Sequence, residues 1–221
     1  MTISGLGNLI RRGTSPLSHL PSTLFRNIYP MRMTVFSTPL LTPLLRLLSI
    51  VGLKLIGWKA VGEEQKNGRF VLIGAPHTSN WDFPLMLMVV LKLRLRVFWM
   101  GKHTLFPFGA GWLMKYLGGI PINRSKSHNV VNETVRLYRE NPEVIVLVPP
   151  EGTRSKVKAW KTGFYHIARN AGVPILMGYV DGDNKEAGLA DFFYPSGDME
   201  ADLIKIREFY ADKKGLIPAN S

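Results

Sequence analysis

Short apolar runs that alternate with helical stretches are the feature that most constrains the fold of this chain. The run EVIVLV at residues 143–148 is the strongest strand signal, and further strands are predicted at residues 69–74, 93–100, 118–122 and 173–180. Helices are predicted at residues 80–91, 104–117, 127–140, 160–170 and 201–213. Strands that alternate with helices pair in parallel, so we expect a single α/β sandwich domain with a mostly parallel central sheet flanked by helices.

The length and composition suit one such domain. The chain has 221 residues, of which 46% are hydrophobic, and this is enough for a sizeable core. It contains no cysteine. Disulfides, a thiolate nucleophile and cysteine-ligated zinc are therefore excluded, and the composition suits a reducing compartment.

Positive charge is concentrated near the N-terminus. Residues 1–62 hold seven Arg or Lys and no acidic residue, in a chain of net charge +12. Such a stretch attracts phosphates, either on nucleic acid or on anionic lipid. We divide the chain into a basic extension (1–34), a membrane-interfacial helix with a linker (35–62) and the α/β domain (63–221). The extension has the composition of an organelle transit segment; the alternative is a non-structural extension before a start at Met31 or Met33.

An apolar helix with a narrow polar side is predicted at residues 39–58, PLLTPLLRLLSIVGLKLIGW. Its length approaches the roughly 20 residues that cross a bilayer, but Thr42, Arg46, Ser49 and Lys54 fall on one arc. The pattern favours a helix in the headgroup region of one leaflet, and the alternative is a core helix that caps the domain. We expect membrane association at the cytoplasmic face of the cell membrane, or at a mitochondrial or plastid membrane if the extension is a transit segment.

Polar residues gather where three of the predicted strands end. His77 follows the first strand, Asn123 and Arg124 follow the third, and residues 151–154 follow the fourth. In parallel α/β sheets, ligands bind among the loops at the carboxyl ends of the strands. We expect these three loops to converge on one site.

His77 and Asp82 suit general-base chemistry. With His77 on the loop and Asp82 in the first turn of the next helix, the carboxylate can accept from Nδ1 and leave Nε2 free as a base. The chain has no GxSxG elbow and no cysteine, so the expected nucleophile is a substrate hydroxyl. The alternative is structural, with Asp82 capping the helix and His77 packed against its neighbours.

Cationic residues predict an anionic, hydroxyl-bearing substrate beside this base. Arginine's planar fork suits phosphate, a Gly-Thr turn can present backbone N–H groups to an anion, and a carboxylate among cations can hold a hydroxyl. For each arginine, the alternative is a solvated salt bridge. The predicted binding residues are Arg124, Glu151, Gly152, Thr153, Arg154 and Lys161.

Four blocks in this order resemble the glycerolipid acyltransferase family, which includes glycerol-3-phosphate and lysophosphatidic acid acyltransferases. The blocks are H-x4-D from His77 to Asp82, GGIPINR, PEGTR and VPI, and together they span residues 77–175. The first block, HTSNWDFPL, resembles a compact, mostly bacterial subgroup. Asn123 stands where many members carry Asp, and Pro149 where many carry Phe.

The resemblance implies transfer of a fatty acyl group from acyl-CoA or acyl carrier protein to a glycerol-phosphate or lysophospholipid hydroxyl, in phospholipid biosynthesis. It implies that His77 is the base, that Asp82 orients it, and that Arg124, Glu151 and Arg154 bind the acceptor. Lys161 resembles a basic element that follows the third block. No metal and no cofactor beyond the acyl donor is expected, and the expected partners are a membrane lipid surface and the two substrates.

Two other functions fit parts of the pattern. A lipid ester hydrolase could use the same base to activate water. Among the other histidines, His103 alone is a candidate for a further role in such an enzyme. A basic nucleic-acid-binding module would need an aromatic platform or a recognition helix, whereas the basic residues here are interleaved with leucines. We expect no nucleic-acid partner, and the sequence does not predict an oligomeric state.

Overall fold

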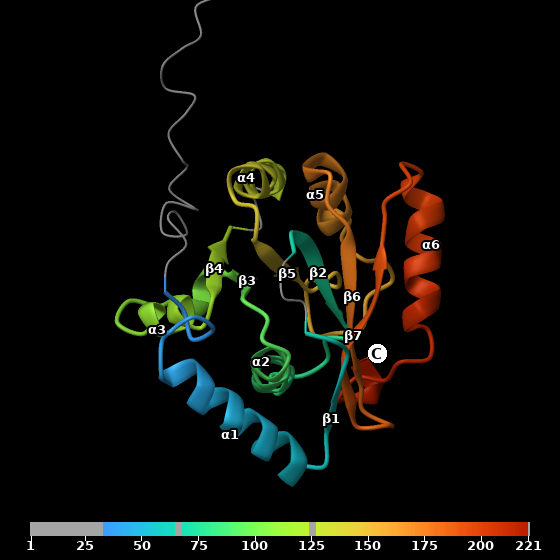
Figure 1. Cartoon of the computed structure of the whole chain (residues 1–221). Coiled ribbons are helices and arrows are strands. Elements are labelled where there is room, and N and C mark those ends of the chain that lie inside the picture. Colours follow the sequence, from blue (N-terminus) through green and yellow to red (C-terminus); the bar gives the residue numbers. More distant parts are fainter. Residues whose placement is uncertain (1–32, 65–67, 124–126, 221) are drawn as a thin grey trace, which may run out of the picture.

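A seven-stranded sheet forms the centre of the protein (Figure 1). The computed structural model describes residues 33–64, 68–123 and 127–220. The strands lie in the order β1-β7-β6-β2-β5-β3-β4, and every neighbouring pair is parallel except β6 and β7. This confirms the predicted mostly parallel α/β fold. The strands are β1 (Lys59–Val61), β2 (Phe70–Ala75), β3 (Val97–Lys102), β4 (Gly119–Ile122), β5 (Ile145–Val148), β6 (Ile175–Asp181) and β7 (Glu186–Phe193).

Helices cover both faces of the sheet (Figure 1). One face carries α4 (Ser127–Glu140), α5 (Gly163–Ala171) and α6 (Met199–Tyr210). The other carries α2 (Asp82–Lys92), on which α1 (Leu41–Leu55) packs. The short helix α3 (Gly111–Tyr116) follows the 3-10 turn η2 (His103–Leu105), and a second turn, η4 (Pro218–Asn220), lies near the end of the chain.

Alternation along the central strands builds two separate cores. On β2, Val71 and Ile73 face α4, α5 and α6, whereas Phe70 and Leu72 face α2. Successive side chains of a strand point to opposite faces, so a continuous apolar run serves both layers. This is why the five predicted strands were visible as apolar runs.

Two strands were missed, and both lie at the same edge of the sheet. β7 pairs antiparallel with β6 through a hairpin turn at residues 182–185, whose Gly-Asp-Asn composition is a turn signal. β1 falls in the stretch 35–62 that was predicted to be helix and linker, and it pairs with β7. Three residues are too few to show a period of their own.

The start of β3 was also predicted too early. The chain turns sharply after α2, with Leu93 N–H bonded to the carbonyl of Val89 and Arg94 at a φ of 56°. These residues close the helix instead of extending a strand, so the predicted strand at 93–100 begins at Val97.

Most of the polar side of α1 faces the domain, with Lys54 as the exception. Arg46 forms an ion pair with Glu64 at 2.8 Å and donates from Nε to the carbonyl of Lys92. Ser49 is buried, whereas Lys54 is exposed. The solvent side is a row of apolar side chains that are mostly half exposed or more: Leu40, Leu44, Leu47, Leu48, Val51 and Leu55. In the part of the chain that the structure describes, no helix is both long enough and apolar enough to span a bilayer.

Candidate active site

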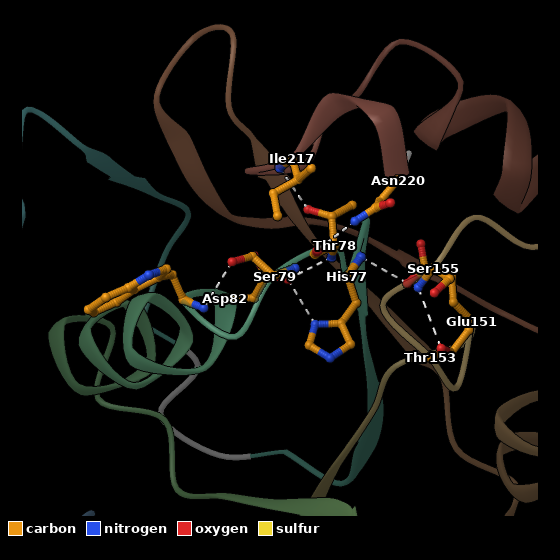
Figure 2. Close-up of polar contacts among 10 residues, drawn as sticks. His77, Thr78, Ser79, Asp82, Glu151, Thr153, Ser155, Ile217 and Asn220 are labelled. Carbon is orange, nitrogen blue, oxygen red and sulfur yellow. Dashed lines mark hydrogen bonds and ion pairs between the residues drawn. The ribbon is translucent and has the colours of Figure 1, made fainter.

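The loop between β2 and α2 holds His77 against Asp82 (Figure 2). One carboxylate oxygen, Asp82 Oδ2, lies 2.9 Å from His77 Nδ1 and accepts from the backbone N–H groups of Thr78 and Ser79, each at 2.7 Å. Asp82 is the first residue of α2, and its side chain is 7% exposed. The helix N-terminus favours a negative charge at this position.

This geometry fixes the tautomer of His77. Two backbone amides already donate to Asp82 Oδ2, so this oxygen acts as an acceptor, and Nδ1 must supply the proton of the third bond. The neutral ring then has an unprotonated Nε2. Because His77 also lines the cavity described below, this nitrogen can accept a proton from a group bound there.

Glu151 holds the same loop from the neighbouring strand. It follows β5, which lies beside β2, and its Oε2 accepts from the backbone N–H of His77 at 2.8 Å. Burial raises the pKa of Glu151 to about 7, against the opposing effect of the hydrogen bond from His77. Glu151 was predicted to bind the acyl-acceptor substrate; in the structure its carboxylate accepts a hydrogen bond from the backbone of the candidate base.

The other predicted binding residues lie around the mouth of the site, with one exception. Gly152, Thr153 and Arg154 line the cavity, and Arg154 is exposed. Lys161 is exposed too, and its aliphatic chain covers Gly152, where an added Cβ would lie 2.8 Å from it. Arg124 lies outside the described residues, so its place in the site stays a prediction.

A cavity of about 580 Å³ opens beside His77 and extends between α2 and the sheet. Its polar end is formed by the His77 loop, residues 152–154 and Lys102. The remainder is mostly apolar, with α2 on one side and strands on the other; its lining includes Leu85, Met86, Val89, Leu147, Val180 and Leu189. A mostly apolar cavity of this volume can hold a hydrocarbon chain whose polar end lies near the histidine.

Two glycines that were not among the predicted site residues lie in the wall of this cavity. Gly74 pairs with Gly178 on the adjacent strand. A Cβ at Gly74 would meet nothing within 4 Å, whereas one at Gly178 would lie 2.8 Å from the carbonyl oxygen of Ile73. The sequence signal that could have found them is a glycine inside a predicted strand, which marks a place where a ligand or another backbone approaches closely.

Residues 59–177, more than half of the chain, match the family model described as Acyltransferase. The chain belongs to the acyltransferase family. Several relatives carry the name 1-acyl-sn-glycerol-3-phosphate acyltransferase, which confirms the resemblance to glycerolipid acyltransferases. The narrower HTSNWD-type subgroup stays a prediction.

The similarity to these acyltransferases covers part of each protein. The Haemophilus influenzae relative is 32% identical over 139 residues, which are 59% of this chain and 55% of the relative. The Salmonella typhimurium relative is 30% identical over 152 residues, 65% of this chain and 59% of the relative. The Escherichia coli relative is 32% identical over 139 residues, 59% of this chain and 54% of the relative. The chain thus spans little more than half the length of these curated relatives.

Glu151→Gln should change how stability depends on pH. The pKa of Glu151 is raised from 4.5 to about 7 in the folded protein. Between these values the folded state holds a proton that the unfolded state releases, so the contribution of Glu151 to the free energy of unfolding falls as pH rises. Across the whole window the loss is on the order of 3 kcal/mol. Glutamine still accepts from His77 N–H but does not titrate in this range.

The measurement is chemical denaturation of both proteins at about pH 4, 5, 6, 7 and 8. The free energy of unfolding of the wild-type chain, minus that of Glu151→Gln, should decrease between about pH 5 and pH 7 and stay constant above. A difference that does not vary with pH would show that the carboxyl of Glu151 titrates normally.

Proposed function

We propose that the protein transfers a fatty acyl group from an acyl thioester to a hydroxyl of a glycerol-phosphate or lysophospholipid acceptor. The observation that carries this proposal is the His77–Asp82 pair in the wall of a mostly apolar cavity. Family membership and the names of the relatives support the same reaction and the same class of acceptor. The thioester is carried by coenzyme A or by acyl carrier protein.

His77 serves as the general base in this proposal. Its Nε2 takes the proton of the acceptor hydroxyl while the hydroxyl oxygen attacks the thioester carbonyl. The new C–O bond forms, the C–S bond breaks, and the imidazolium returns the proton to the leaving thiolate. Asp82 keeps the imidazole in the reactive tautomer and stabilises its positive charge during the transfer, as the aspartate does in a Ser-His-Asp triad.

The acyl chain of the donor lies in the apolar cavity between α2 and the sheet. Because the polar end of that cavity is at His77, an inserted chain would bring its thioester carbonyl to the base. The acceptor phosphate is bound at the mouth by Arg154 and Lys161, with the backbone of Gly152 and Thr153 beside them. Arg124 is proposed as a further ligand of the acceptor, on the strength of the family motif alone.

We also propose that the protein attaches to one leaflet of an anionic membrane through α1. The helix exposes Leu44, Leu47 and Leu48 by more than half, with Leu40 and Leu55 still more exposed at its ends. Apolar surface of this kind inserts at the headgroup boundary, and the basic, acid-free stretch at residues 1–62 adds attraction to anionic lipid. The lipid substrates would then be drawn from the same surface.

His77→Ala should abolish most acyl transfer without unfolding the protein. Loss of a general base costs about 10²–10⁴-fold in rate. Asp82→Asn should also be severely impaired, because an asparagine that donates through its amide favours the wrong tautomer. His166→Ala is the matched control, since His166 is an exposed residue of α5 on the opposite face of the sheet.

The assay uses the full chain with acyl-CoA or acyl carrier protein donors and a panel of glycerol-phosphate and lysophospholipid acceptors, with products identified by mass. Near-normal turnover in a folded His77→Ala protein would contradict the mechanism. Release of free fatty acid without an ester product would instead favour the hydrolase alternative.

Substitutions at Gly74 should shorten the preferred acyl chain. A side chain at this position enters open space in the cavity, so the series Gly74→Ala, Gly74→Val and Gly74→Leu fills it in steps with little strain. We expect kcat/KM for the longest accepted donor to fall by about tenfold or more in the leucine variant, since lost burial costs ~0.8 kcal/mol per CH₂. Short-chain donors should be affected least.

The measurement is kcat/KM against donor chain length for the three variants, with thermal unfolding as the fold control. Equal losses at every chain length would place the acyl chain outside this cavity.

Charges on the exposed side of α1 should weaken membrane binding. Leu44→Glu with Leu48→Glu removes two apolar groups, each worth about 1.5–3 kcal/mol when buried, so partitioning into anionic vesicles should fall by about tenfold or more. Ile204→Glu is the control, because Ile204 is an equally exposed side chain on α6, at 54%. Vesicle sedimentation measures both, and equal binding by the two variants would exclude α1 as the attachment site.

A further inference from the structure

The end of the chain returns to the loop that carries the candidate base. The C-terminal tail, defined here as residues 214–220, follows α6 and lies against Thr78 (Figure 2). Ile217 N–H donates to the hydroxyl oxygen of Thr78 at 3.1 Å, and Asn220 Nδ2 donates to the Thr78 carbonyl at 3.2 Å. The partners are 139 and 142 residues apart in sequence, so the contact is long-range.

The tail is itself fixed on the domain. The carbonyl of Lys214 accepts from Gly182 N–H at 2.6 Å, next to the turn that joins β6 to β7. Gly215 lets the tail approach closely, since an added Cβ there would lie 2.9 Å from the Cβ of Thr78. Leu216 packs against the core on the α2 side of the sheet, and the turn η4 closes with Asn220 N–H on the carbonyl of Ile217.

Thr78 connects this tail to the carboxylate of Asp82. Its hydroxyl and carbonyl accept from the tail, while its backbone N–H donates to Asp82 Oδ2 at 2.7 Å. The residue is 1% exposed although it belongs to a loop at the site. The carbonyl of Thr78 shares its peptide group with the N–H of Ser79, which is the second amide that donates to Asp82 Oδ2.

We propose that the C-terminal tail is a positioning element for the His77–Asp82 pair. By fixing the side chain and the carbonyl of Thr78, it keeps the amides of Thr78 and Ser79 aimed at Asp82 and so holds the imidazole of His77 at the cavity. Thr78, Ile217 and Asn220 are positioning residues; they do not touch the reacting groups. The kinetic consequence rests on the proposed acyl transfer, whereas the geometric one does not.

The experiment uses the full chain with two matched pairs of variants. Asn220→Asp keeps the shape of the side chain but removes its N–H donor, and Ala219→Asp places the same charge on the exposed neighbour. Thr78→Val removes the hydroxyl acceptor with little change in volume, and Thr78→Ser retains it. For each variant we would measure kcat, KM for donor and acceptor, thermal unfolding, and the His77 Nδ1–H proton signal in a ¹⁵N-histidine-labelled sample.

We expect Asn220→Asp and Thr78→Val to lower kcat by about tenfold, because small misplacements of a reacting group can cost up to about 10²-fold. Both KM values should stay within about twofold of wild type, and the Nδ1–H signal of His77 should broaden through faster exchange with water. Ala219→Asp and Thr78→Ser should keep most of the activity and the sharp signal.

An unchanged kcat and an unchanged His77 signal in folded Asn220→Asp and Thr78→Val proteins would overturn the proposal. A change confined to KM would overturn it too, because the tail would then act on substrate binding. If the wild-type chain transfers no acyl group to any acceptor, the proposed function fails, and the His77 signal alone still decides whether the tail positions the pair.

Discussion

A single carboxylate oxygen organises this site. Asp82 Oδ2 accepts from the ring of His77 and from the amides of Thr78 and Ser79. The two amides curl the loop around the carboxylate, and the position of Asp82 at the N-terminus of α2 adds the favourable field of the helix. Charge-assisted bonds to a buried acceptor are stronger than neutral ones, so the same interaction shapes the loop, begins the helix and fixes the tautomer of His77.

Two further segments hold that loop from outside. Glu151 reaches the His77 amide from the strand beside β2, and the C-terminal tail reaches Thr78 from beyond α6. Two consecutive residues, His77 and Thr78, are therefore held by three other segments: the start of α2, the loop after β5 and the C-terminal tail. A loop that carries a reacting group needs this support, because loops are otherwise the mobile parts of a fold. The pKa of Glu151 is raised because burial in that position disfavours the charged carboxylate.

The sequence predicted what depends on local pattern and spacing. The five-residue offset of His77 and Asp82 was enough to place one on a loop and the other on a helix, and continuous apolar runs located the central strands. The hydrogen bond between Glu151 and His77 depends on β2 and β5 being neighbours, which the order of strands along the chain does not give. The contact of the tail with Thr78 and the pairing of the edge strand β1 with β7 are likewise long-range, and local composition carries little trace of them.

The sequence showed the polar arc of α1, but it could not show which part of the protein this arc contacts. Helical periodicity separates two sides of a helix without saying which one meets the protein. Arg46 prefers Glu64 and the carbonyl of Lys92 because these satisfy its donors at short range, and that contact turns the leucines outward. Arg46, one of the two charges that had suggested a place in the headgroup region, is thus the group that docks α1 on the domain.

Helix α2 then links the proposed membrane contact to the proposed chemistry. Its first residue holds His77, one side lines the apolar cavity through Leu85 and Val89, and another side packs on α1. The approach to α1 is close, since a Cβ at Gly52 would lie 3.3 Å from the sulfur of Met88. Packed helices transmit displacement because interiors are dense. A lipid surface that orients α1 would therefore also orient the wall of the acyl cavity and the start of the helix that fixes the base.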